Sequence, residues 1–112
     1  MEHIPQSQAG VFQGESVTSY EYPTSNEHMN VALIKISGRY PEHGFTSNTL
    51  VESLIHVVAG RGTLGMEDGR MIEITTNDQV YLAIGDAYFF DGELEVVYAA
   101  TPKWTPEQTL HT

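Results

Sequence analysis

The side chains that could do chemistry in this sequence are mainly phenols, hydroxyls and amides. The chain has no Cys, which excludes disulfides, thiolate metal sites and a cysteine nucleophile. His3, His28 and His111 form no H-x-H or H-x3-H spacing, so we assign them no role in metal binding. No candidate has an evident general base beside it, and we therefore assign no catalytic residue.

Tyr88 is the most informative of these side chains. It stands in the segment "NDQVYLAIGDAYFFDG", residues 77–92, and Phe90 follows it at the two-residue spacing of one strand face. A buried phenol can offer a hydrogen bond or a proton to a small ligand, with Phe90 as an apolar wall. Alternatively, the two aromatic rings fill the core. The sequence leaves both interpretations open.

Composition limits the classes of partner. At 112 residues the chain is long enough for a single domain, residues 1–112, and a net charge of −10 opposes binding to nucleic acid or to anionic lipid. No segment approaches the about 18 apolar residues of a membrane span, and the N-terminus lacks the features of a signal peptide. We expect a cytoplasmic protein without nucleic-acid or membrane partners.

Apolar residues recur at period two, and Gly, Pro, Asn and Asp interrupt them at short intervals, which predicts an all-β fold. About nine short strands are expected, at residues 11–12, 17–22, 31–36, 49–58, 63–66, 71–75, 79–82, 88–90 and 94–100. The Asp-Gly pair in "MEDGR" predicts a hairpin between residues 62–66 and 71–75. Thr105, Pro106 and Gln108 have the spacing of a helix start, so at most one short C-terminal helical turn is expected.

The middle of the chain resembles the cupin superfamily of small antiparallel jelly-roll barrels. In "GRYPEHGFTSNTLVESLIHVVAGRGTL", Gly38 and Gly60 match the glycines that open and close the first cupin motif, at about residues 38–62. Residues 77–78 and Gly85 match the second motif, at about residues 77–92. The ending "YAATPKW" followed by "TPEQ" is similar to a subgroup of single-domain cupins labelled mannose-6-phosphate-isomerase-like. The resemblance implies a cupin-type barrel in one domain.

The metal ligands of that family are replaced in this sequence. Their positions fall on Ser53 for the glutamate, on Ser47 and Thr49 or Thr46 and Asn48 for two histidines, and on Tyr88 for the last histidine. Hydroxyls and an amide are poor ligands for a divalent transition metal. Glu52 is one residue out of register, which points it to the opposite face of its strand. We predict no metal and no other cofactor at the usual centre.

The same alignment places a set of polar and aromatic side chains around the barrel interior. The predicted ligand-binding residues are Tyr88, Phe90, Ser53, Thr49, Asn48, Thr46 and Arg39, with Arg39 as a possible anionic handle. We predict a metal-independent protein that binds a small polar ligand, for which a carbohydrate-like molecule is one candidate. Two alternatives stay open: a sugar isomerase or epimerase-like enzyme, and a non-catalytic structural or interaction module whose barrel is filled by aromatic rings.

Other residues have structural roles as the simpler interpretation. His56 shares a strand face with Leu54 and Val58, opposite to Ser53, and is expected at a packing surface or interface. Trp104 is expected to anchor the terminal segment, although it could also stack on a sugar ring. The apolar outer face of Leu50, Leu54 and Val58 predicts a homodimer.

Overall fold

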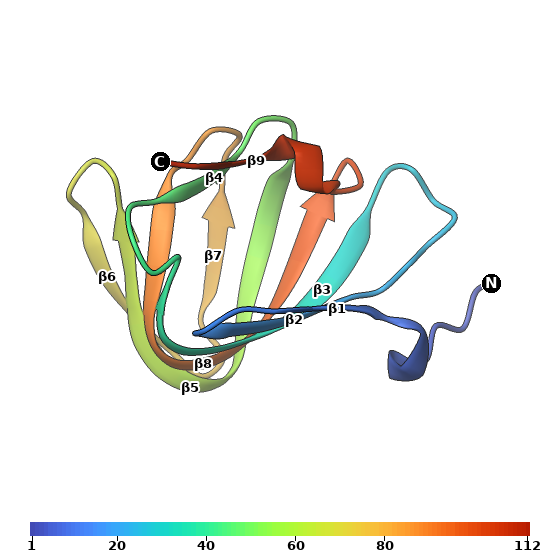
Figure 1. Cartoon of the computed structure of the whole chain (residues 1–112), viewed down its shortest axis with the longest axis horizontal. Coiled ribbons are helices and arrows are strands. Elements are labelled where there is room, and N and C mark those ends of the chain that lie inside the picture. Colours follow the sequence, from blue (N-terminus) through green and yellow to red (C-terminus); the bar gives the residue numbers. More distant parts are fainter.

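Nine strands form one antiparallel sheet that curls into a small barrel (Figure 1). The computed structural model describes all residues, 1–112. The strands are β1 (Gly10–Gln13), β2 (Val17–Glu21), β3 (Asn30–Tyr40), β4 (Thr46–Asn48), β5 (Glu52–Met66), β6 (Met71–Thr75), β7 (Gln79–Leu82), β8 (Tyr88–Thr101) and β9 (Thr109–His111). The predicted all-β barrel of about nine strands is confirmed.

The long strands β5 and β8 pair along almost their whole length and bend together at the base of the barrel (Figure 1). The prediction of separate strands at 49–58 and 63–66, and at 88–90 and 94–100, was wrong. Each of these strands continues through a glycine with positive φ, which bends it: Gly60 in β5 has φ +91° and Gly92 in β8 has φ +147°. A Cβ on Gly60 would collide with the carbonyl oxygen of Glu93, so the close approach of the two strands requires glycine.

The start of the predicted 49–58 strand also differs. Residues 49–51 are not in a strand, and β4 before them pairs with β9 and, through Thr46 opposite Tyr88, with β8. The short strands β4 and β9 lie across the open end of the barrel in Figure 1. The C-terminal strand therefore closes the end of the barrel opposite the bend.

The predicted hairpin and the predicted C-terminal helical turn are both present. Strands β5 and β6 form the predicted hairpin, with Gly69 at φ +98° in the turn. The predicted C-terminal turn is the 3-10 helix η2 (Pro106–Gln108), in which Gln108 Nε2 donates to Thr105 Oγ1 at 3.3 Å. A second 3-10 turn, η1 (Gln6–Gln8), was not predicted. Neither helical segment could cross a membrane.

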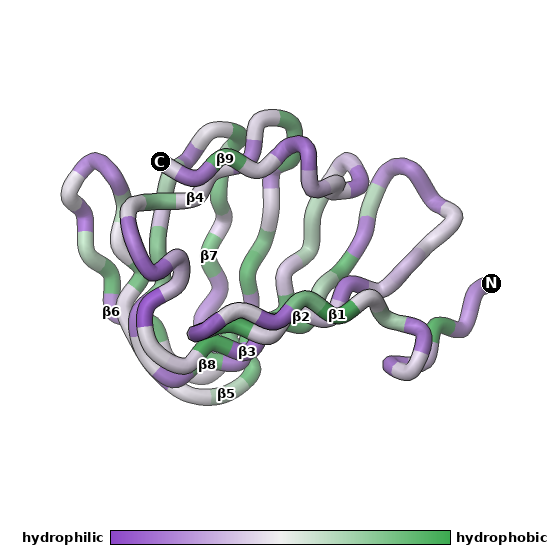
Figure 2. The backbone as a smooth tube through the Cα atoms, viewed as in Figure 1, coloured by the Kyte–Doolittle hydropathy of each residue, from purple (hydrophilic) through white to green (hydrophobic).

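The core follows the two-residue alternation of the strands. On β8, Leu94, Val96, Tyr98 and Ala100 are buried while the residues between them are half-buried. Figure 2 shows the hydropathy changing along the strands, with the most hydrophilic stretches at loops such as 67–70. The largest fully buried side chains are Ile55, Leu64, Val51, Val57 and Val96. These apolar residues fix which side chains of each strand face the interior.

Candidate functional site

A cavity of about 470 Å³ lies between the β1–β2 hairpin, the inner face of β3 and β8, and the C-terminal segment. Its volume is in the range of small-molecule sites. The lining residues are Gly10, Val11, Phe12, Val17, Ser19, Glu21, Ile34, Tyr40, Asn48, Tyr88, Tyr98, Trp104, Pro106, Thr109 and His111. The barrel is therefore not completely filled by its aromatic rings.

Tyr88 lines this cavity at the start of β8. Its side chain is buried and its ring meets the ring of Phe90 edge-on, with centroids 5.5 Å apart and an interplanar angle of 78°. Burial raises the pKa of the Tyr88 phenol well above its ordinary value, and the neighbouring phenols of Tyr98 and Tyr40 add to the rise. None of the protein's side-chain hydrogen bonds involves the Tyr88 hydroxyl, whereas the Tyr98 oxygen accepts from Asn48. The Tyr88 hydroxyl is thus a neutral donor available to a ligand.

Tyr98 is held by a network that also contains the tryptophan. Asn48 Nδ2 donates to Tyr98 Oη at 2.8 Å, and Asn48 Oδ1 accepts from Trp104 Nε1 at 3.2 Å and from Thr109 Oγ1 at 2.9 Å. An indole N–H can only donate, so it fixes which end of the Asn48 amide faces Tyr98. Because the Tyr98 oxygen accepts from Asn48, its own O–H proton is free to point elsewhere.

Glu21 brings a carboxylate to the same cavity from the end of β2. Val17 and Ser19 on that strand are buried, and the alternation places Glu21 on the same inner face. Burial raises the pKa of Glu21, and a hydrogen bond from Ser19 partly opposes the rise. Burial also raises the pKa of Tyr98; the Ser53 hydroxyl opposes this and the charge of Glu21 adds to it. Sequence reasoning missed Glu21, although its spacing from Val17 signals its direction.

The predicted site residues divide between the cavity, the core and the surface. Tyr88 and Asn48 line the cavity. Phe90, Ser53 and Thr46 are buried in the barrel wall next to it but are not part of its lining.

Thr49 and Arg39 lie elsewhere. Thr49 is exposed. Arg39 donates through Nη1 to Pro41 O at 2.7 Å and through Nη2 to Gly44 O at 3.0 Å, and its guanidinium stacks on the ring of Phe89 at 3.9 Å. These contacts hold the following loop, and Arg39 is not part of the cavity lining.

The residues at the usual cupin metal positions do not fit a metal ion. Ser53 and Tyr88 provide a hydroxyl and a phenol, and Glu52 is exposed on the outer face, where it accepts a hydrogen bond from Tyr81 Oη at 3.1 Å. The predicted outward direction of Glu52 is confirmed. No three His, Cys, Asp or Glu side chains are grouped so that they could share a metal ion. The donor set at the centre is suited to hydrogen bonding.

Two further predictions concern histidine and tryptophan. Half-buried His56 lies on the outer face with exposed Leu54 and Val58, as predicted. His111, to which the sequence assigned no role, is exposed at the edge of the cavity. Trp104 both packs against the core and lines the cavity, so the anchor and the possible ligand contact coincide.

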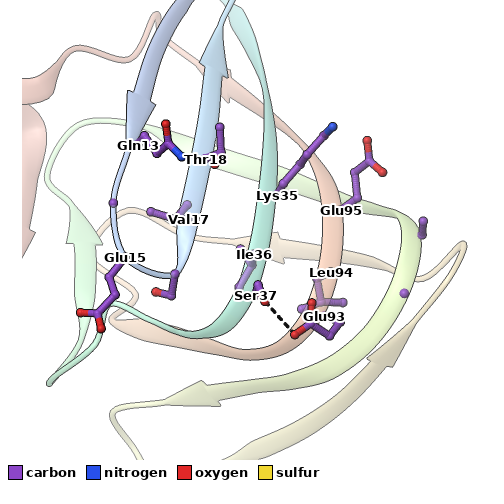
Figure 3. A pocket seen from close by; sticks show the side chains of 14 residues that line it. Gln13, Glu15, Val17, Thr18, Lys35, Ile36, Ser37, Glu93, Leu94 and Glu95 are labelled. Carbon is purple, nitrogen blue, oxygen red and sulfur yellow. Dashed lines mark hydrogen bonds between the residues drawn. The ribbon is translucent and has the colours of Figure 1, made fainter.

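A second hollow, of about 380 Å³, is an open groove at the bend of the barrel (Figure 3). Glu15, Glu93 and Glu95 line it together with Lys35, and Ser37 Oγ donates to Glu93 at 2.8 Å. It lacks the cavity's cluster of aromatic rings and buried phenols. We therefore place the candidate site in the cavity beside Tyr88 and Glu21.

Solved structures share this arrangement of strands at low sequence identity. Pac13, described as a nucleoside dehydratase, gives a TM-score of 0.89 at 12% identity, covering 100% of this chain and 91% of Pac13. This chain has a cupin fold. The polyketide cyclase RemF from Streptomyces resistomycificus gives a TM-score of 0.77 at 12% identity, covering 100% of this chain and 85% of RemF. Ectoine synthase from P. lautus gives 0.76 at 11% identity, covering 100% of this chain and 90% of the synthase.

Sequence comparison adds nothing to this result. No protein-family model matches the chain, and no curated protein matches it. The structural likeness defines the fold, and the chemistry of the cavity has to be argued from its own residues.

Proposed function

We propose that the cavity binds a small polar ligand that carries a sugar ring, and that it does so without a metal ion. The observation that carries the proposal is Tyr88, which lines an aromatic-walled cavity of about 470 Å³ and whose hydroxyl takes part in none of the protein's side-chain hydrogen bonds. Tyr98, Glu21 and Asn48 supply further polar groups in the same lining. Aromatic walls with a few placed polar groups are typical of sites for ring-shaped ligands.

A structural neighbour supports the choice of ligand class. A Streptomyces Pac13 variant was solved with uridine, and it has a TM-score of 0.89 to this chain at 12% identity. A nucleoside combines a sugar ring with a flat base, which suits a cavity bounded by the indole of Trp104 and by tyrosine phenols. Nucleosides and neutral sugars are therefore the first ligands to test.

The test is ligand binding by calorimetry, together with the shift in melting temperature. A ligand at about 100 times its dissociation constant stabilises the folded protein by about 2.7 kcal/mol. We expect Tyr88→Phe to weaken binding at least about tenfold, as loss of one good hydrogen bond would. Tyr81→Phe, which changes an exposed tyrosine on the outer face, is the matched control and should bind as wild type. A ligand whose affinity is the same in both variants would argue against the proposed role of Tyr88.

Metal independence needs its own measurement. Binding should be unchanged after exhaustive treatment with a chelator, because hydroxyl and phenol donors replace the ligands of a cupin metal. If no nucleoside or sugar stabilises the protein, the interpretation as a non-catalytic module gains support.

One observation favours acid–base catalysis on the bound ligand as a second candidate. Glu21 and the phenols of Tyr88 and Tyr98 line one cavity, which places a carboxylate base and neutral phenolic acids around the same space. A sugar isomerase or epimerase-like reaction needs such a pair. The mannose-6-phosphate-isomerase-like label would further require a phosphate site, and neither Lys nor Arg lines the cavity. Turnover of a bound sugar that is lost in both Glu21→Gln and Tyr88→Phe would support catalysis.

We also propose that two copies pair through the outer face of β5 and β7. Leu54 and Val58 are each 44% exposed, and Tyr81, opposite Leu54, is 56% exposed. An apolar sheet face of this kind is typical of an interface. Light scattering should report a dimer for wild type and a monomer for Leu54→Glu. A monomeric wild type would contradict this pairing.

A further inference from the structure

Glu21 is the one acidic side chain that lines the cavity, and it has no cationic partner. Its carboxylate accepts from Ser19 Oγ at 3.4 Å and from Asn30 Nδ2 at 3.3 Å. Both distances are at the long end for hydrogen bonds, and both donors are neutral. A carboxylate can accept about four hydrogen bonds, so most of the capacity of Glu21 is unused.

Asn30 connects this carboxylate to another wall of the cavity. The Asn30 side chain donates to Glu21 from Nδ2 and accepts from the backbone N–H of Trp104 at 2.9 Å. Asn30 itself is buried. The strand bearing Glu21 is thus tied to the C-terminal segment that forms another wall of the cavity.

The rest of the lining offers no buried cation to an anion. It contains no Lys or Arg, and the one imidazole, His111, is exposed at the edge. A phosphate placed there would lose its hydration beside a carboxylate without gaining a cation. The net charge of −10 adds to this exclusion.

The same lining suits a positive charge. Tyr40, Tyr88, Tyr98 and Trp104 bring four aromatic side chains to one cavity with Glu21. Aromatic faces attract ammonium groups, and the attraction increases when water is excluded. A carboxylate in partly buried surroundings gains more from an ammonium group than from a neutral donor.

We infer that the cavity recognises an unphosphorylated ligand that carries a basic amine, such as an amino sugar or an aminonucleoside, through an ammonium–carboxylate bond to Glu21. The inference rests on the proposed function and narrows its ligand class. Tyr88 and the other aromatic residues then contact the sugar or base ring, and the Glu21 carboxylate selects ligands that carry a positive charge.

Matched ligand sets test the charge requirement directly. One set is glucose, glucosamine and glucose phosphate. The other is uridine, its analogue with an amine in place of the primary hydroxyl, and uridine monophosphate. Titration calorimetry on wild type should show the amine binding at least about tenfold more tightly than the neutral member in at least one set, with no binding of the phosphate. This comparison needs no variant.

Two variants locate the effect. Glu21→Gln should abolish the preference for the amine, so that this variant binds the amine and the neutral member of a set with affinities within about twofold to threefold of each other. Glu15→Gln removes the same charge from an exposed position in the groove at the bend, so it controls for the general field of the protein. It should keep the full preference.

The outcomes separate this inference from the proposed function. Equal affinities for amine and neutral members, tighter binding of the phosphate, or a preference that survives in Glu21→Gln would overturn the inference while ligand binding in the cavity stands. If only the neutral members of the two sets bind, the inference is likewise overturned and ligand binding in the cavity stands. If no member of either set binds, both the inference and the proposed function are wrong for sugar-ring ligands.

Discussion

Asn48 on β4 donates a hydrogen bond of 2.8 Å to the phenol oxygen of Tyr98 on β8, fifty residues along the chain. Through its carbonyl oxygen the same amide accepts from Trp104 and Thr109 in the C-terminal segment. One side chain thus joins a wall of the cavity to the segment that closes it. The cavity's shape depends on this junction because β9 pairs with no strand other than β4.

Replacing Asn48 by alanine should loosen this closure. The substitution removes the partner of the Tyr98 oxygen and one acceptor of the Trp104 N–H, and we expect the free energy of unfolding in urea to fall by about 1 to 3 kcal/mol. Trp104 emission should shift to longer wavelength as the segment becomes more hydrated. Thr49→Ala, at the exposed neighbouring position, should change neither quantity. Equal stability of Asn48→Ala and wild type would show that the junction contributes little.

The lack of a hydrogen bond at the Tyr88 hydroxyl has a consequence for stability as well as for ligand binding. Tyr88 is buried but its hydroxyl takes part in no side-chain hydrogen bond, so Tyr88→Phe should change the free energy of unfolding by no more than about 1 kcal/mol in the absence of ligand. Denaturant titration of the ligand-free protein measures this change. A loss well above that size would mean that the hydroxyl has a structural partner and is not kept free for a ligand.

Glu21 predicts a specific dependence of stability on pH. Burial raises its pKa above the ordinary value of 4.5, so the folded protein binds this proton more tightly than the unfolded chain. The resulting stabilisation is complete below about pH 4.5 and is lost as the pH rises through the folded-state pKa. At neutral pH, Glu21→Gln should therefore be more stable than wild type, and the difference should shrink in acid. Unfolding curves at several pH values measure it.

The opposite result would be informative. Wild type more stable than Glu21→Gln at neutral pH, with the gap closing in acid, would mean that Glu21 has a lowered pKa and a structural partner. A gain in stability with a loss of amine binding is the trade-off expected of a residue that is retained for binding.

Where β5 bends over β8, alanine should be tolerated less well at Gly60 than at Gly85, which lies outside the bend. Gly60 and Gly85 both have positive φ, but a Cβ on Gly60 would collide with Glu93, whereas a Cβ on Gly85 would have open space around it. Gly85→Ala should cost about 1 to 2 kcal/mol for the backbone conformation alone. Gly60→Ala should cost clearly more, or prevent folding, because it also separates the two long strands. Melting temperatures that fall equally would contradict the close contact at Gly60.

Much of the fold could be predicted from local sequence signals. Period-two alternation located most strands, and the Asp-Gly pair located the β5–β6 hairpin. The joining of strands across Gly60 and Gly92 could not be predicted, since glycine interrupts a local pattern whether it ends a strand or bends it. Only the pairing of β5 with β8 decides between these outcomes.

The candidate site could be predicted only in part. Tyr88 and Asn48 were found by aligning the sequence with the two cupin motifs, and both line the cavity. Glu21 was not predicted, because its role depends on β2 packing over the interior and on Asn30 and Tyr98 from distant strands. Arg39 was predicted as an anionic handle, but it donates to the carbonyls of Pro41 and Gly44 and does not line the cavity.

The central claim is that the barrel cavity binds a small polar ligand without a metal. Its most direct test is a crystal structure of the protein, purified without chelator and crystallised with the tightest-binding nucleoside or sugar. We predict ordered density for the ligand within hydrogen-bond distance of Tyr88 and Glu21, and no metal peak in anomalous maps. A metal ion coordinated inside the barrel, or a ligand bound away from this cavity, would contradict the account.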